Sequence, residues 1–159
     1  MTEKQFQKIF SWVTKSPVRE KGILFLNKWL PWILAVFFGL FSIWRIFSGQ
    51  DVIALWLRPA LCFIVVTIFR KCLNKQRPYD RLGFKPLADY TPGKGKSFPS
   101  RHTASAFAIA LSVMGACFPA GILCLAAAFL IAVLRVICGL HDPQDVVGGV
   151  FFALIFEIL

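Results

Sequence analysis

The chain has 159 residues, enough for one domain and too few for two large ones, and 57% of them are hydrophobic. Only 16% are charged, so the long apolar stretches indicate an integral membrane protein rather than a soluble domain with a large core. The net charge of +10 favours an anionic lipid partner over nucleic acid, since a nucleic-acid binder would not hide most of its length in hydrocarbon.

The N-terminal segment, residues 1–30, predicts amphipathic helix. Apolar side chains recur at helical spacing from Phe6 to Val13, with lysines on the opposite side. Thr2 and Gln5 fit a capping box, and Ser16-Pro17 is typical of the N-cap and first position of a second helix. We therefore expect this segment to lie in the headgroup region rather than span the bilayer.

Five apolar stretches follow, each judged against the ~20 residues that cross a bilayer. The turns SGQD and FPAG join the first to the second and the third to the fourth, whereas a long polar loop, Arg70 to Ser100, joins the second to the third. The expected fold class is all-α: a polytopic membrane helical bundle of about five spans, one domain over residues 1–159, with 31–159 as the transmembrane core. The expected spans are Pro31–Phe47, Val52–Phe69, Arg101–Phe118, Pro119–Cys138 and Asp145–Leu159.

The first polar motif is RKCLNKQRPYD, at the end of the second span. Arg70 and Arg77 are seven residues apart, so a continuing helix would place both on one face. Two planar guanidinium groups that reach one point can bind a tetrahedral oxyanion bidentately. The alternative is a positive cluster that anchors the helix to lipid headgroups, which is the interpretation favoured for Lys71 and Lys75.

The second motif is SFPSRHTASAF, at the start of the third span. Pro99 and Ser100 predict a helix start that places Arg101 and His102 in the first turn. A first turn offers unpaired backbone N–H groups and the positive end of the helix dipole, which together form an anion site. The alternative is an ordinary capped helix with an interfacial Arg and His.

The third motif is LRVICGLHDPQDVVGG. Asp142 followed by Pro143 predicts an N-cap and first helical position, so His141 precedes the helix and Asp145 lies in its first turn. A carboxylate there can bind one imidazole nitrogen and leave the other free to attack. An interfacial histidine beside a helix-start acid is the alternative. Arg135 argues for a functional site, because a charge inside the membrane end of a span is costly.

Together the three motifs, which fall on one membrane face by the count of crossings, resemble those of the type 2 phosphatidic acid phosphatase (PAP2) superfamily. Its signatures are K-x6-RP, PSGH and SR-x5-H-x3-D, and the chain has R-x6-RP, PSRH and R-x5-H-x3-D between Arg70 and Asp145. The resemblance implies that His141 is the nucleophile, forming a phosphohistidine, that Asp145 orients it, and that His102 is the general acid. The positions that match phosphate-binding residues are Arg70, Arg77, Ser100, Arg101 and Arg135, with Lys71 as an alternative to Arg70.

Three positions depart from the family pattern. Arg70 replaces lysine and keeps the charge, and Arg101 replaces glycine, so the backbone there cannot need a glycine-only conformation. Leu134 replaces the serine before Arg135. None of these changes deletes a catalytic group, so we expect activity.

The residue types alone, without the family resemblance, also indicate the chemistry of the site. Two histidines, one backed by an acid and surrounded by arginines, suit phosphoryl transfer through a covalent histidine intermediate. A two-metal hydrolase would need more acidic ligands than the chain supplies here, so we expect no metal and no cofactor. The acidic residues in question are Asp80, Asp89, Asp142 and Asp145.

The expected substrate is a lipid with its phosphate head in the interface: phosphatidic acid, phosphatidylglycerol phosphate or polyprenyl diphosphate. The loop Gly83 to Lys96 either covers the site, with Lys94 and Lys96 attracting the head, or is a solvated basic loop, which is favoured for the two lysines. Two rival functions are a lipid phosphotransferase with the same site and a membrane protein that only binds headgroups.

Two features of the sequence disagree about which side of the membrane the motifs face. Both the N-terminal segment and the motif loop are basic, which the positive-inside rule assigns to the cytoplasmic face. The resemblance implies a bacterial cytoplasmic membrane protein whose site faces outside, and we favour it because phosphate binding explains several of the loop cations. At the opposite face we expect Glu157 to form an ion pair with Arg45 or Arg58.

Overall fold

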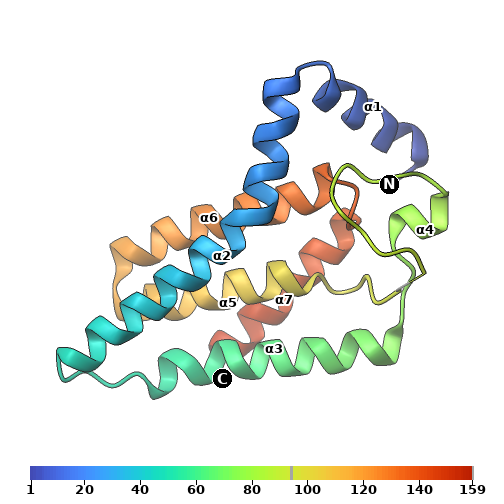
Figure 1. The fold of residues 1–159 in the computed structure, drawn as a ribbon. Coiled ribbons are helices and arrows are strands. Elements are labelled where there is room, and N and C mark those ends of the chain that lie inside the picture. Colours follow the sequence, from blue (N-terminus) through green and yellow to red (C-terminus); the bar gives the residue numbers. More distant parts are fainter. Residues whose placement is uncertain (94, 159) are drawn as a thin grey trace.

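The computed structural model describes residues 1–93 and 95–158, and these residues fold into α-helices joined by turns and loops (Figure 1). Lys94 and Leu159, which belong to the expected loop and last span, lie outside the described residues. The helices are α1 Glu3–Thr14, α2 Pro17–Phe47, α3 Ile53–Leu73, α4 Pro78–Leu82, α5 Arg101–Ala116, α6 Phe118–Ile137 and α7 Pro143–Ile158. The all-α bundle expected from the sequence is therefore confirmed.

The N-terminal segment forms α1 and the first half of α2. The capping box is present: the Gln5 amide donates to Thr2 Oγ1 at 3.4 Å, and the Thr2 amide donates to Gln5 Oε1 at 2.8 Å. No helix end separates this segment from the first expected span, because α2 continues without interruption for 31 residues. Pro31 lies inside it, and the helix changes direction near that point (Figure 1), as a missing N–H and a ring clash require.

At the centre of the bundle lies α5, which packs against α6, α7 and α3. Its buried face is rich in alanine, including Ala104, Ala106, Ala108 and Ala110. Small side chains allow neighbouring helix backbones to approach closely, which is how membrane helices associate when lipid removes the hydrophobic drive between them. The short helix that carries PSRH is thus held on three sides.

Three segments in the described part are long and apolar enough to cross a membrane: α2, the stretch Ile53–Leu82 that contains α3, and α6. Large apolar side chains on α2 and α3 are exposed, among them Trp32, Leu40, Ile64 and Ile68. Such a surface is stable in hydrocarbon and not in water. The protein is therefore an integral membrane protein, as expected.

Two connections differ from the expectation. The residues FPAG do not form a turn, because α6 begins at Phe118 and Cys117 alone separates it from α5. The loop Arg70 to Ser100 is partly helical, since α3 runs to Leu73 and α4 follows. Pro is well suited to a first helical position, which explains the start of α4 at Pro78.

A second apolar cluster seals the end of the bundle that carries the motifs. Phe6 and Phe10 of α1 pack with Phe84 and with Cys138 and Leu140, which follow α6. Gly139, with φ of +74°, makes this contact possible, because a Cβ there would lie 2.7 Å from the Phe10 ring. The amphipathic helix α1 is thereby fixed on the same face as the three motifs.

Candidate active site

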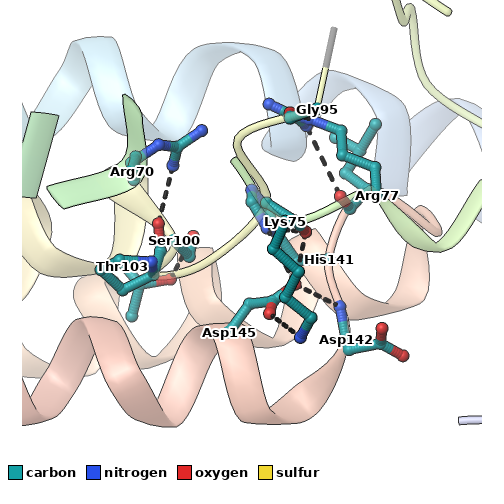
Figure 2. A network of polar contacts seen from close by, with 12 residues as sticks. Arg70, Lys75, Arg77, Gly95, Ser100, Thr103, His141, Asp142 and Asp145 are labelled. Atoms are coloured by element: carbon teal, nitrogen blue, oxygen red, sulfur yellow. Dashed lines mark hydrogen bonds and ion pairs between the residues drawn. The ribbon is translucent and has the colours of Figure 1, made fainter. Parts of the chain in front are cut away.

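His141 and Asp145 form the centre of the site (Figure 2). Asp142 and Pro143 start α7 as expected, since the Asp145 amide donates to the Asp142 carbonyl at 2.9 Å. This turn places His141 Nδ1 3.5 Å from Asp145 Oδ2, with both side chains almost fully buried. The carboxylate holds Nδ1 and leaves Nε2 as the nitrogen able to attack.

Two residues that the sequence did not assign to the site also bind the Asp145 carboxylate. Ser97 Oγ donates to Oδ2 at 2.5 Å, and Lys75 Nζ lies 2.8 Å from Oδ1. The interpretation of Lys75 as a headgroup anchor is therefore wrong. No pattern in the sequence marks Ser97 or Lys75, because the loop between α3 and α5 brings them to α7 only in the folded chain.

Ser97 also contacts the imidazole, at 3.4 Å from Oγ to His141 Nδ1. A hydroxyl has one hydrogen, and Ser97 gives it to Asp145, so its oxygen faces Nδ1 as an acceptor. The proton on Nδ1 is thus favoured by both neighbours. The result is a neutral tautomer with its lone pair on Nε2.

Burial is the main influence on the titration of His141. It lowers the pKa of the imidazole from its ordinary value of 6.5 to about 4, against the opposing effect of the hydrogen bond to Asp145. His141 is therefore neutral at ordinary pH. A neutral imidazole is the form that can act as a nucleophile.

Arg70 and Arg77 both reach this end, but not as a continuing helix. Asn74, with φ of +41°, ends α3, and the residue before Pro78 is extended, with φ of −77° and ψ of 155°. The expectation of one helical face is therefore wrong, although both side chains point into the site. Arg70 donates to the Pro99 carbonyl at 2.8 Å, and Arg77 donates to the carbonyls of Gly95 at 3.3 Å and Leu140 at 3.5 Å.

Ser100 precedes α5 as predicted and is fully buried. Its hydroxyl accepts from Thr103 Oγ1 at 3.0 Å, and its amide donates to the Asp145 carbonyl at 2.7 Å. Ser100 thus occupies the predicted N-cap position, but its side chain makes no capping hydrogen bond. These contacts fix the first turn of α5 against α7, and Arg101 extends from it to lie 5.3 Å from the Phe63 ring centre.

His102 and Arg135 line two cavities at this end of the bundle, of about 340 and 330 Å³. Arg135 is buried at the end of α6 and donates to the Asn27 carbonyl at 3.3 Å, while its Nε has no partner among the described residues. A backbone hydrogen bond joins Arg135 to His141, whose amide donates to the Arg135 carbonyl at 3.2 Å.

The remaining predicted residues lie at the edge of the site or outside it. Lys71 and Lys96 are exposed, and Lys94 lies outside the described residues. Asp142 is buried and accepts from Arg81 at 3.2 Å and from the Met1 amine at 2.9 Å. In the part of the chain that the structure describes, no three His, Cys, Asp or Glu side chains are grouped to hold a metal ion.

The fold and the site define a membrane-embedded enzyme in which arginines surround a buried His–Asp pair. The model of the PAP2 superfamily matches residues 51–159 of the sequence. The chain therefore belongs to the PAP2 superfamily, and it is a lipid phosphatase of that superfamily. The resemblance seen in the three motifs is confirmed, and the alternative of a protein that only binds headgroups is wrong.

Among solved structures, the crystal structure of LpxE from Aquifex aeolicus is similar to this chain. The two share 27% sequence identity and a TM-score of 0.72, over 99% of this chain and 97% of the other. No curated protein matches the sequence. The similarity to LpxE includes α1 and the first 50 residues, which the superfamily model does not cover.

Proposed function

We propose that this phosphatase hydrolyses a lipid phosphate at the membrane surface through a phosphohistidine on His141. The observation that carries the proposal is the buried His141–Asp145 pair at the end of the bundle where Arg70, Arg77 and Arg135 converge. Phosphoryl transfer needs positioned positive charge around the phosphorus and an oriented nucleophile, and this end of the bundle supplies both.

In the first step Nε2 of His141 attacks phosphorus, and the P–N bond forms as the bond from phosphorus to the leaving oxygen breaks. His102 in its protonated form donates a proton to that oxygen. Water then attacks the phosphohistidine, His102 takes its proton, and the P–N bond breaks to release inorganic phosphate. Asp145 and Ser97 hold the His141 ring throughout, which fixes the attacking geometry.

Arg70, Arg77 and Arg135 neutralise the charge that spreads over the phosphoryl oxygens in the transition state. Ser100, Arg101 and the amides of the first turn of α5 add the positive end of a helix dipole. Each arginine already donates to a backbone carbonyl, so its remaining N–H groups are held in place before substrate arrives. Such preorganisation is the main source of catalytic stabilisation in sites of this kind.

The membrane arrangement we propose is a single domain over residues 1–159 with five spans. α2, α3 and α6 are long enough to cross alone, and α5 and α7, of 16 residues each, cross at the centre of the bundle with their ends sheltered by the longer helices. α1 and the first half of α2 lie in the headgroup region, with the lysines of α1 toward anionic lipid.

We place the site on the outer face of a bacterial cytoplasmic membrane. The positive-inside rule would place the basic motif loop in the cytoplasm. Three of its cations are instead explained by contacts within the protein, since Arg77 and Lys75 bind groups of the site and Arg81 binds Asp142. Single-cysteine variants Lys85→Cys and Gln50→Cys, at opposite ends and without the native cysteines, test this in intact cells. Labelling of Lys85→Cys alone by an impermeant maleimide supports the assignment, and labelling of Gln50→Cys alone contradicts it.

The function is tested by phosphate release from a panel of lipid phosphates by the detergent-solubilised protein, with and without a chelator. We expect release by the wild type in both conditions and none by His141→Ala. A phosphate bound to protein in an acid-labile linkage should be trapped in the wild type and absent from His141→Ala. Release by His141→Ala would refute the nucleophile, and transfer to an added lipid alcohol instead of water would assign a phosphotransferase.

A further inference from the structure

Two cavities meet at the catalytic end, and three cationic or titratable side chains line both of them: Lys28, His102 and Arg135. The lateral cavity, of about 340 Å³, continues along apolar residues of α2, α3 and α5. The loop cavity, of about 330 Å³, opens beside Leu87, Ala88 and Asp89. Lys28 is on α2, outside the residues that the superfamily model matches, and no step proposed above uses it.

The two cavities differ in charge. Lys28, Arg101, His102 and Arg135 line the lateral cavity, and no acidic residue is among the described residues that line it. The loop cavity shares three of these but adds the carboxylate of Asp89. An anion is therefore more stable in the lateral cavity, beside the apolar surface that suits a lipid tail.

The position of Lys28 follows from its neighbour on α2. Asn27 is buried, and its carbonyl accepts the hydrogen bond from Arg135 at 3.3 Å, which ties this turn of α2 to the end of α6. Asn27 Oδ1 and Arg135 Nε are buried and have no partner among the described residues. Lys28 follows directly on α2, three residues before Pro31: it is exposed, it lines both cavities, and its Nζ lies 5.7 Å from the centre of the Trp29 ring.

The geometry of phosphoryl transfer indicates which part of the substrate Lys28 could bind. The leaving oxygen departs opposite the attacking nitrogen, on the side of the general acid, and His102 lines the lateral cavity. If the substrate is a simple phosphate ester, the leaving group is an alcohol and needs no further positive charge. If it is a diphosphate, the leaving group is itself a phosphate and needs one.

We propose that Lys28 binds the leaving-group phosphate and that the substrate class is therefore a lipid diphosphate. The inference rests on the proposed function. The terminal phosphorus bonds to His141 Nε2 as its bond to the bridging oxygen breaks, and the electron pair of that bond stays on the departing lipid monophosphate. Lys28 and Arg101 bind the departing phosphate, and its lipid chain occupies the apolar part of the lateral cavity.

The test compares a prenyl diphosphate with the prenyl monophosphate of the same chain, in the same detergent micelles. For Lys28→Gln we expect kcat/KM for the diphosphate to fall about 10- to 100-fold, the range for a lost charge-assisted contact, with the monophosphate within about twofold. Lys28→Arg should keep most of the diphosphate activity. Lys21→Gln, an exposed residue of the same helix away from both cavities, should change neither activity.

Equal losses on the two substrates, or no loss on either, would overturn the role of Lys28. A wild type whose kcat/KM is higher for the diphosphate than for the monophosphate supports the substrate class, and one whose kcat/KM is equal for the two or higher for the monophosphate refutes it. These outcomes are separate from the proposed function, which fails if His141→Ala still releases phosphate or if the wild type transfers phosphate to an added lipid alcohol instead of water.

Discussion

Lys75 Nζ lies 2.8 Å from Asp145 Oδ1 and thereby ties the segment after α3 to the first turn of α7. Asp145 is fully buried, and the same carboxylate accepts from Ser97 and from the Asp142 amide at 3.1 Å. The Asp145 carboxylate is thus held by three donors, Lys75 and Ser97 from distant positions in the chain and the Asp142 amide three residues away. This arrangement keeps the carboxylate in one orientation before substrate binds.

Removing the Lys75 charge should leave the Asp145 carboxylate buried without its cation. Loss of one partner of such a pair costs about 3–5 kcal/mol when both are buried, and less here, because Lys75 is 29% exposed. We expect Lys75→Gln to lower both kcat and the melting temperature in detergent, with KM little changed. Lys85→Gln, an exposed lysine of the same loop, is the control. A kcat equal to the control would contradict the positioning role.

Ser97→Ala should remove the hydroxyl that contacts both Asp145 and His141. Loss of a hydrogen bond to a charged group costs about 1.5–3 kcal/mol, so we expect kcat to fall about 10- to 100-fold while KM changes little. Ser11→Ala serves as the matched control, since that hydroxyl is exposed on α1 and bonds only the Lys8 carbonyl. An unchanged kcat in Ser97→Ala would show that Asp145 alone orients the ring.

Stability should fall as pH is lowered from about 6.5 to about 4, because of His141. Its pKa is lower in the folded chain than in the unfolded one, so within this window the unfolded chain binds more protons. The contribution of neutral His141 to the free energy of unfolding is complete above pH 6.5 and is lost as the pH falls toward 4. Melting temperature measured against pH should fall less steeply for His141→Gln than for the wild type, and parallel curves would contradict the assignment.

Gly149→Ala should disrupt the contact between α7 and α5. A Cβ there would lie 2.8 Å from the Ser100 carbonyl oxygen and 3.0 Å from Thr103 Cβ, and backbone cannot yield cheaply. Overpacking of this kind costs about 1–3 kcal/mol, and it displaces Ser100 in the site. Gly22→Ala, with nothing within 4 Å of the added Cβ, should be neutral or stabilising. Equal melting temperatures for the two variants would count against this packing.

The ion pair expected at the opposite face is present between Arg58 and Glu157, with Arg58 NH1 2.8 Å from Glu157 Oε1. We expect Glu157→Ala and Glu157→Gln to lower the melting temperature equally, by a few degrees, which corresponds to about 1 kcal/mol for a chain of this size. Arg45→Ala is the contrast, since Arg45 donates to the Asp51 carbonyl and not to Glu157. No effect from either Glu157 variant would refute a stabilising pair.

Much of the local structure follows from the sequence because it depends on near neighbours. The capping box of Thr2 and Gln5 and the start of α7 at Pro143 are present as predicted. The three motifs also lie at one end of the bundle, as the count of apolar stretches between them predicts. The helix start predicted at Ser16-Pro17 is also present, whereas the continuation of that helix through Pro31 was not predicted.

Three motifs in the sequence determined the class of protein, because phosphoryl transfer needs particular residue types at fixed spacing near helix ends. Only the tertiary structure decided what holds those residues. Ser97 and Lys75 are 48 and 70 residues from Asp145 along the chain, and Lys28 shares cavities with His102 on another helix. Contacts of this kind depend on how helices pack and loops return, so no spacing rule along the chain can specify them.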